Sequence, residues 1–270
     1  MADKLSLLMI FLWMFFCAEL ASGQGSVQSF QSGEYARYGA YFNWNFIWIQ
    51  SGEAEFAADT VSYGNQKAWN LRSYGKTYKA YDLVYKVRDS LQTFCTYDSF
   101  RPIYSYRALN HAKERSVHQY RFDPPSGTIA SSIKPDKKPL VQGNFPIQEN
   151  TFDLLGTAYN FRNTDFSKLF VGQKVPYRMI IDQKVDELFF RYLGTEIVKT
   201  RNGKKYRCHK VSVYLQKGDF FAEGEYMKIW FTDDKNHLPV QVETEIIIGS
   251  VKALLLETKN MKYPLTSLIN

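Results

Sequence analysis

The sequence predicts a mainly β fold: a curved antiparallel meander sheet, or half-open barrel, packed on one or two short helices. Aromatic residues make up 16% of the chain, several stretches alternate side-chain character with a period of two, and short turn-forming segments separate those stretches. We expect one β-rich domain over residues 33–263. A flexible lead-in, residues 24–32, would precede it, and a C-terminal tail, residues 264–270, would follow it.

The start of the chain is typical of a cleaved signal peptide. Lys4 precedes an apolar run, residues 5–18, that is too short to cross a bilayer as an ordinary helix, and the small residues 21–23 follow it. We expect residues 1–23 to be removed and the protein to be exported to a periplasmic or outer-envelope location. A retained N-terminal anchor is the alternative.

The first expected strand is the most aromatic part of the chain. Residues 40–49 alternate so that Phe42, Trp44 and Trp48 fall on one face, and Gly52 ends the strand. A strand with such a broad aromatic face needs a covered side. Turn signals bound further strands at residues 52–61, 67–75, 91–98, 103–109, 115–123 and 127–134.

Two segments have the apolar spacing of a helix. Residues 78–89 place Tyr81 and Tyr85 one helical turn apart. Residues 151–162 form the better candidate, because Thr151 can cap the N-terminus and one apolar stripe follows. That stripe consists of Leu154, Leu155, Ala158 and Phe161.

The C-terminal half is again expected to be β structure. It follows residues 134–150, a stretch with three prolines that we expect to be a surface loop or a hinge. Within this half, Asn202-Gly203 is a strong signal for a tight turn. Strands are expected at residues 175–182, 184–200 and 204–215, on both sides of residues 233–238, and at residues 251–257.

The net charge of +7 permits several kinds of partner. The basic residues are scattered rather than grouped, and export argues against a nucleic acid. A solvated basic surface is the ordinary explanation, and a patch that faces anionic lipid or glycan, with peripheral membrane contact, is the alternative.

An adjacent pair of aspartates raises the question of catalysis. Asp233 and Asp234 would point to opposite sides of an extended strand, which makes them poor partners in one acid–base dyad. Asn236 tolerates positive φ and Pro239 suits the start of an outgoing strand. We therefore interpret these four residues as a structural turn.

The remaining reactive side chains form no catalytic motif. His111, His118, His209 and His237 have neither HExxH nor another paired spacing, so the sequence predicts no metal and no cofactor. There is no glycine-rich phosphate loop and no Gly-x-Ser-x-Gly elbow. These absences favour a non-catalytic protein.

Two cysteines lie in expected strands of the mature chain, Cys95 and Cys208. Export permits a disulfide between them, and two separate buried thiols explain the sequence equally well. Neither belongs to a CxxC motif, which argues against redox catalysis.

Several stretches together resemble DUF3108, an uncharacterised family of exported bacterial proteins. They are residues 33–56, 81–109, 152–166, 194–211 and 229–255, and the last, IWFTDDKNHLPVQVETEIIIGSVKALL, is the most specific. The likeness is greatest to members from Bacteroidetes, which implies a periplasmic or outer-envelope location. It implies no activity. The hairpin around the aspartates also resembles one in the periplasmic lipoprotein carriers, whose half-open barrel surrounds helices; this is an analogy of fold.

Aromatic residues provide the remaining functional signal. A sheet curled around one helix can leave apolar volume for a lipid or another amphiphile, and Trp44, Trp48, Phe190, Tyr192 and Trp230 are the candidate ligand-binding residues. Ordinary core packing is the alternative role for these side chains.

Two other functions stay open. An interaction or assembly protein would use an exposed sheet face or edge to bind an envelope partner. A hydrolase of envelope glycan or lipid would need Asp89, Asp165, Asp233 or a histidine within hydrogen-bond distance of another such group.

Overall fold

The fold is described from a computed structural model of the chain, which places residues 28–44, 47–111, 114–215, 224–245 and 250–269. The expected signal peptide lies outside these residues. The described chain forms one sheet of 16 strands that does not close on itself, together with short helices. The mainly β meander predicted from the sequence is therefore confirmed.

The strands follow one another in space almost as they do in the sequence. All neighbours pair antiparallel except β9 and β10, which are parallel. Their bounds are β1 (Glu34–Trp44), β2 (Ile47–Tyr63), β3 (Gln66–Thr77), β4 (Arg88–Thr96), β5 (Pro102–His111), β6 (Glu114–Asp123), β7 (Thr128–Pro135), β8 (Val141–Pro146), β9 (Thr151–Phe152), β10 (Lys174–Ile181), β11 (Lys184–Lys199), β12 (Lys205–Leu215), β13 (Gly224–Thr232), β14 (Pro239–Glu245), β15 (Ser250–Lys259) and β16 (Leu268–Ile269).

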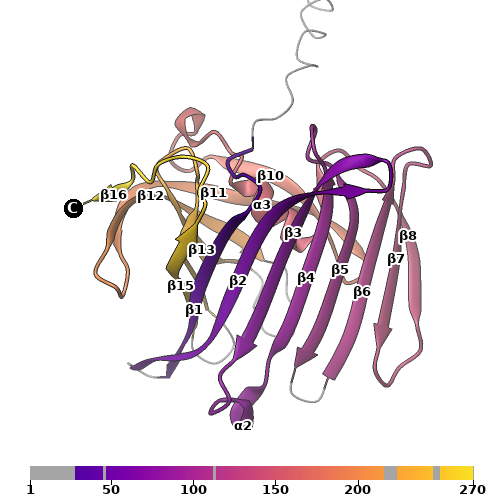
Figure 1. Cartoon of the computed structure of the whole chain (residues 1–270), viewed down its shortest axis with the longest axis horizontal. Coiled ribbons are helices and arrows are strands. Elements are labelled where there is room, and N and C mark those ends of the chain that lie inside the picture. Colours follow the sequence, from indigo (N-terminus) through magenta and orange to yellow (C-terminus); the bar gives the residue numbers. More distant parts are fainter. Residues whose placement is uncertain (1–27, 45–46, 112–113, 216–223, 246–249, 270) are drawn as a thin grey trace, which may run out of the picture.

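The sheet has two halves that meet at β1. From β1, the strands β2 to β8 extend to one edge, and β15 back to β10 extend to the other, where β9 is the last strand (Figure 1). The halves join because β1 pairs with β15 along its length, from Tyr35 opposite Lys259 to Asn43 opposite Ser250. The first and last long strands thus complete one continuous wall.

The two halves also touch across the inside of the curve. Asp182 and Gln183 form the turn between β10 and β11, and both have positive φ, as a two-residue hairpin turn requires. The backbone N–H of Asp182 donates to the Tyr120 hydroxyl at 3.0 Å, and Nε2 of Gln183 donates to Ser131 Oγ at 2.7 Å. The hairpin tip therefore docks on the inward face of β6 and β7.

Helix α3 (Leu154–Phe161) lies inside the curve, but it does not begin where the sequence indicated. The N-cap is Asp153, whose Oδ2 accepts from the Leu155 backbone N–H at 3.2 Å. The same oxygen accepts from Oγ1 of Thr93 on β4, at 2.7 Å. The predicted cap, Thr151, instead belongs to β9, because the chain must first pair with β10 before it turns into the helix.

The prediction of a helix over residues 78–89 is mostly wrong. Only α2 (Asp82–Tyr85) is helical, and it is one turn long. No side chain caps its N-terminus, and the backbone is already extended at Lys86. Val87 then forms a bridge with His111, so sheet pairing takes over where the helical pattern was expected to continue.

The first expected strand is in fact a hairpin. β1 ends at Trp44 and β2 begins at Ile47, and these two residues pair across the turn. Phe42 pairs with Ile49, whereas Trp48 pairs with Asn43. Phe42 and Trp48 are therefore on opposite faces rather than on one. The reversal was missed because Asn45-Phe46 lacks the glycine that usually marks such a turn.

Three segments expected to be irregular are packed or paired. Strand β8 lies within residues 134–150 and pairs with β7. In the expected lead-in, Phe30 is fully buried, and in the expected tail Ser267 is fully buried while β16 pairs with β12. The packed domain therefore extends further at both ends than the strand pattern indicated.

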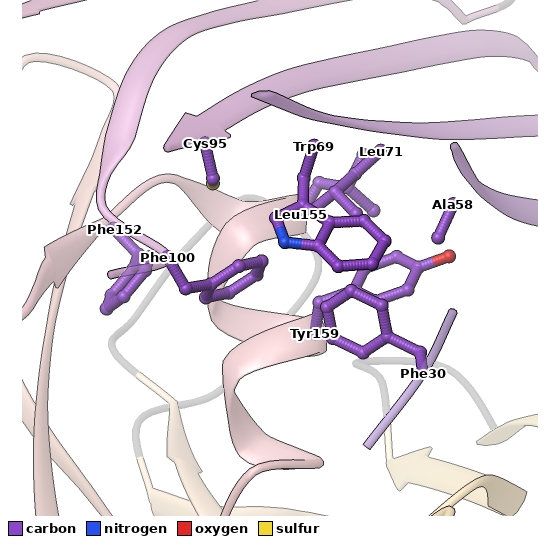
Figure 2. Close-up of a cluster of buried hydrophobic side chains, with 9 residues drawn as sticks. All are labelled: Phe30, Ala58, Trp69, Leu71, Cys95, Phe100, Phe152, Leu155 and Tyr159. Carbon is purple, nitrogen blue, oxygen red and sulfur yellow. The ribbon is translucent and has the colours of Figure 1, made fainter. Parts of the chain in front are cut away.

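The main core surrounds Phe30 and α3 (Figure 2). The Phe30 ring makes edge contacts with Trp69 and Tyr159, with ring centroids 4.9 and 5.0 Å apart. Aromatic edge contacts of this kind add to the free energy gained from burial. The core fills the end of the sheet where β2 turns into β3, and consists of Phe30, Ala58, Trp69, Leu71, Cys95, Phe100, Phe152, Leu155 and Tyr159.

Candidate functional site

One face of β1 and the C-terminal half is lined by apolar side chains. Directly paired residues project on the same side of a sheet, so a face can be followed through the register from strand to strand. Two adjacent rows cross from β1 through β15, β14, β13 and β12 to β11, and we call them the inner wall. The first is Phe42, Val251, Thr244, Met227, Val213, Phe190 and Val175 of β10; the second is Ala40, Ala253, Val242, Ile229, Val211 and Tyr192.

A largely charged row lies on the opposite face of the same strands. The row between the two apolar ones runs on the outer side, and Lys252 on it forms an ion pair with Glu243 at 3.1 Å. Alternation with period two therefore places a largely charged row behind the two apolar ones, although Cys208 and Trp230, elsewhere on the same face, belong to a small buried apolar cluster. The outer row is Tyr41, Lys252, Glu243, Lys228, Ser212, Arg191 and Lys174.

The inner wall is only partly covered. Phe161 of α3 and Phe166 of the 3₁₀ helix η1 (Phe166–Lys168) pack against Phe190 and Tyr192, which are buried. Val211, Val213, Ile229 and Thr244 are buried as well. The apolar residues of the wall that stay half-buried are Ala40, Phe42, Val175, Met227, Val242, Val251 and Ala253.

The N-terminal half shows a gradient of burial along its inward face. Ala58, Leu71 and Cys95, at the end near Phe30, are fully buried. Ile49 and Leu91, nearer to α2, are only half-buried. The inside of the curve is thus filled around α3 and becomes more exposed towards the end of the sheet that carries α2 (Figure 1).

A polar cluster lies on the inward face of β5 and β6, where the β10–β11 turn docks. Nη2 of Arg107 is 3.0 Å from Nδ1 of His118 and forms an ion pair with Asp182. Oδ1 of Asp182 is 3.3 Å from the same Nδ1, and Oγ of Ser116 is 2.9 Å from Nε2. Serine, histidine and aspartate are therefore in contact in the order that serine hydrolases use.

The protonation of His118 opposes that use. A guanidinium only donates, so Arg107 requires Nδ1 to accept, and the neutral ring then carries its proton on Nε2 and donates it to Ser116. Burial, followed by the charge of Arg107, lowers the pKa of His118 to about 4. A neutral ring in this tautomer has no free nitrogen to take the Ser116 proton, and the cluster holds the docked turn instead.

Two more histidines are in contact with aspartates. Nε2 of His111 is 2.6 Å from Oδ2 of Asp89, and Nε2 of His209 is 3.0 Å from Oδ1 of Asp233. Both pairs are within hydrogen-bond distance, which is what a hydrolase would need of these side chains. Nδ1 of His209 is 3.1 Å from the Tyr192 hydroxyl, so both of its ring nitrogens already have protein partners. Burial lowers the pKa of His209.

The neighbouring aspartates have separate partners. Burial raises the pKa of Asp233, but the hydrogen bond from Arg207 and the charge of His209 outweigh it, so the net shift is downward. Oδ1 of Asp234 accepts from the backbone N–H and from Nδ2 of Asn236, at 3.0 and 3.1 Å. Its Oδ2 accepts from Ser267 Oγ at 2.6 Å. Asp234 thus holds the turn before Pro239, and the two carboxylates share no partner among these contacts.

The aromatic residues singled out from the sequence do not form one site. Phe190 and Tyr192 are on the inner wall. Trp230 lies between two residues of that side, so it projects outwards, where Nε1 donates to Glu196. Trp48 also faces outwards, with Nζ of Lys252 4.5 Å from its ring centroid. The side chain of Trp44 lies outside the described part of the structure.

The two cysteines are free, so the disulfide considered from the sequence is not formed. Cys95 belongs to the core around Phe30, whereas Cys208 packs with Trp230 on the outer side of β12. Burial raises the pKa of Cys208 to about 12 and that of Cys95 well above its usual range. Both side chains are therefore apolar packing groups.

Two shallow pockets lie away from the inner wall. One, of about 430 Å³, crosses the outer face of the N-terminal half between Tyr35 and Tyr106. The other, of about 360 Å³, lies beside Phe30 and Tyr97. Within the described residues, no cluster of three or more histidine, cysteine or acidic side chains is arranged to hold a metal ion. No described helix has the length and hydropathy to cross a membrane.

Comparison with known proteins places the chain in a family. The profile of DUF3108, described as a protein family of unknown function, matches residues 37–256. The chain belongs to this family. No curated protein sequence matches it.

A solved structure supports the same architecture. The crystal structure of a β-barrel-like protein of domain of unknown function DUF1849, from Brucella abortus, aligns over 85% of this chain and 98% of its own, with a TM-score of 0.53 and 9% identity. At this identity the likeness concerns the fold alone. The DUF3108 chain therefore shares a barrel-like β architecture with a protein whose own description gives no function.

The inner wall itself was not found from the sequence. Its strands alternate, and that signal was visible, but the wall appears only once β1 is paired with β15. The residues that the sequence indicates are all aromatic, whereas the half-buried part of the wall is mostly aliphatic. Alternation in the C-terminal strands, followed on both faces, is the signal that identifies it.

Proposed function

We propose that this DUF3108 protein is a non-catalytic envelope protein that binds a lipid or another amphiphile on its inner wall. The observation that carries the proposal is the pair of apolar rows across six strands, which stay half-buried at Met227, Val242 and Val251 although the row behind them is largely charged. An apolar ligand that binds to a concave wall of this kind gains free energy because it removes exposed apolar surface from water.

The chemistry of the wall favours an amphiphile over a polar ligand. Its half-buried side chains offer dispersion contacts and no ionisable group, so a ligand gains free energy there by removing apolar area from water. Strands β4 and β5 of the other half add polar groups, including Asp89 and His111. A ligand with an apolar chain and a polar end matches both surfaces.

Export and a Bacteroidetes-type origin belong to the same proposal. The N-terminal segment supports secretion, because its apolar run is short and ends in small residues. Fractionation of cells that express the full chain is expected to recover the processed protein with the periplasm or the outer envelope. Recovery of the unprocessed chain in the cytoplasm would contradict this part of the proposal.

Ligand recovery tests the binding function directly. The processed protein, purified without detergent, is extracted with organic solvent and analysed by mass spectrometry, and delipidated protein is then exposed to an envelope extract and analysed again. We expect an amphiphile in both extracts. Its absence from both would overturn the proposal.

A matched pair of variants locates the binding surface. Val242→Thr with Val251→Thr adds two hydroxyls to the inner wall at almost constant volume, whereas Val61→Thr with Val117→Thr makes the same change at half-buried valines of the outer face. Loss of apolar contact is expected to weaken binding of the recovered amphiphile by roughly tenfold in the inner variant alone. Equal effects of the two variants would exclude the inner wall as the site.

The serine–histidine–aspartate contact gives hydrolysis as a second candidate. It predicts that Ser116 reacts with a fluorophosphonate probe and that Ser116→Ala abolishes the labelling. The tautomer imposed by Arg107 leads us to expect no labelling of the native protein. Labelling that is lost in Ser116→Ala would replace the binding proposal with an acyl-transfer enzyme.

A further inference from the structure

One end of the sheet gathers the connections between alternate strands. In a meander, every second connection lies at the same end, and here α2 and the β7–β8 connection share the lower end of Figure 1. We call this the α2 end and define it by residues 78–87 and 134–141. It is also the end towards which the inward face becomes half-buried at Ile49 and Leu91.

The α2 end exposes isolated aliphatic side chains. Leu83, on the single turn of α2, is 94% exposed, the highest value among the exposed large hydrophobic side chains of the described chain. Leu140 and Val141, at the start of β8, are each 47% exposed. They come from two separate connections, so they form projecting points and not a flat patch of the kind that packs against a folded partner.

Basic side chains lie on the same two segments. Lys79 is exposed beside α2, Lys134 is exposed near the end of β7, and Lys137 and Lys138 are exposed in the β7–β8 connection. Asp82, the acidic residue of α2, is already neutralised by Arg88, with 2.7 Å between Oδ2 and Nη2. Exposed Asp136 is the acidic exception in the β7–β8 connection. The α2 end therefore combines projecting apolar side chains with excess positive charge.

We propose that the α2 end docks on the surface of an anionic lipid bilayer, with Leu83 entering the interface and the lysines facing lipid headgroups. Projecting leucines gain free energy by leaving water for the acyl boundary, and each lysine is attracted by the negative surface potential. Docking in this orientation turns the exposed end of the inner wall towards the membrane. That last step rests on the proposed function, since the membrane would supply or receive the amphiphile there.

Vesicle sedimentation tests the docking. The processed full-length protein is mixed with vesicles of phosphatidylcholine alone or with phosphatidylglycerol added, at low and high salt. We expect the protein to bind the anionic vesicles and the bound fraction to fall as the salt concentration rises, because salt screens the attraction between the lysines and the anionic headgroups. Binding that is equal for both vesicle types, or absent from both, would overturn the proposal.

Two variants assign the contact to this end. Leu83→Ser is expected to weaken vesicle binding by roughly tenfold, as fits the loss of one inserted leucine. Lys137→Gln with Lys138→Gln is expected to weaken it by at least roughly tenfold at low salt. Phe170→Ser is the matched control, because Phe170 is 70% exposed but lies in the connection before β10, outside the α2 end. An effect of Phe170→Ser as large as that of Leu83→Ser would contradict the assignment.

The two proposals fail separately. Leu83→Ser leaves the inner wall unchanged, so amphiphile recovered from it at native yield, together with lost vesicle binding, supports docking as a distinct property. Recovery of an amphiphile with no vesicle binding by the native protein would reject docking and leave the binding function in place. Vesicle binding that is sensitive to Leu83, with no recoverable amphiphile, would keep docking and reject the ligand.

Discussion

Arg162 and Glu34 form a buried ion pair that joins the C-terminus of α3 to the start of β1, 128 residues away in the chain. Nη2 of Arg162 donates to Oε2 of Glu34 at 3.2 Å, and Nε donates to the Asn236 carbonyl at 3.1 Å. The side chains are only 5% and 2% exposed. One guanidinium thus connects the helix, the first strand and the turn between β13 and β14.

Glu34→Gln is expected to lower the free energy of unfolding by about 3–5 kcal/mol, because it leaves the Arg162 charge buried without its counterion while it preserves side-chain shape. Urea denaturation measures the change. Asp59→Asn is the control, since it removes a surface pair with Arg72 and is expected to cost less than about 1 kcal/mol. Equal effects of the two substitutions would show that the buried pair does not hold the helix in place.

Stability is expected to fall as the pH drops below about 6.5, in part because of His118. The folded-state pKa of His118 is about 4, compared with an ordinary value of 6.5, owing first to burial and then to Arg107. Between these values the unfolded chain binds the proton and the folded chain does not, so acid favours unfolding. The stability that neutral His118 contributes above pH 6.5 is therefore lost as the pH falls towards about 4.

His118→Gln tests that contribution. A glutamine oxygen can accept from Arg107 but does not titrate, so the variant is expected to lose less stability between pH 7.5 and pH 4.5 than the native protein, by up to about 3 kcal/mol. Burial also lowers the pKa of His209 and His237, which leaves part of the dependence in place. A pH profile identical to that of the native protein would exclude His118 from it.

Much of the strand order was predictable because hairpin signals are local. The stretches that form β3, β5, β6 and β12 are bounded by turn residues a few positions away. The same reasoning failed at the β1–β2 reversal, where Asn45-Phe46 carries no such signal. It also failed at Thr151 and Asp153, since either residue can cap a helix and the pairing of β9 with β10 decides between them.

The candidate site was less predictable because it is built from distant segments. Residues of the inner wall share a face only through the β1–β15 pairing, and that pairing leaves no signal near Phe42 or Val251. The contact of Asp182 with His118 likewise depends on where a hairpin tip docks. By contrast, the separate partners of Asp233 and Asp234, which directly follow the end of β13 at Thr232, agree with the period-two geometry expected from the sequence.

Native Cys95 and Cys208 are expected to be unreactive towards a thiol reagent at neutral pH. Both are fully buried and free, and burial raises the pKa of each thiol, so little thiolate exists and access is blocked. In denaturant, two thiols of the processed chain should react rapidly. Fast reaction of either thiol in the native state would show that its cluster opens locally without global unfolding.

Substitution at the start of α3 separates the two possible caps. Asp153→Ala removes the acceptor for Leu155 and Thr93, and is expected to cost about 1–3 kcal/mol in unfolding free energy. Thr151→Val is expected to be neutral or slightly stabilising, because the buried Thr151 hydroxyl has no hydrogen-bond partner. Chemical denaturation of the two variants measures both effects. A larger loss in Thr151→Val would restore Thr151 as the cap.

Ligand binding to the inner wall is expected to raise the unfolding temperature of the delipidated protein. A ligand that binds only the folded state adds RT ln(1 + [L]/Kd), about 2.7 kcal/mol at a hundredfold excess over Kd. Titration of the recovered amphiphile should therefore shift the midpoint progressively in the native protein and in Val61→Thr with Val117→Thr. In Val242→Thr with Val251→Thr, the same shift should require roughly tenfold more ligand, because the half-buried valines contact the apolar chain directly. If all three proteins show the same shift at each concentration, the amphiphile binds elsewhere. The half-buried apolar rows would then be exposed apolar surface that lowers the stability of the open sheet and that no ligand covers.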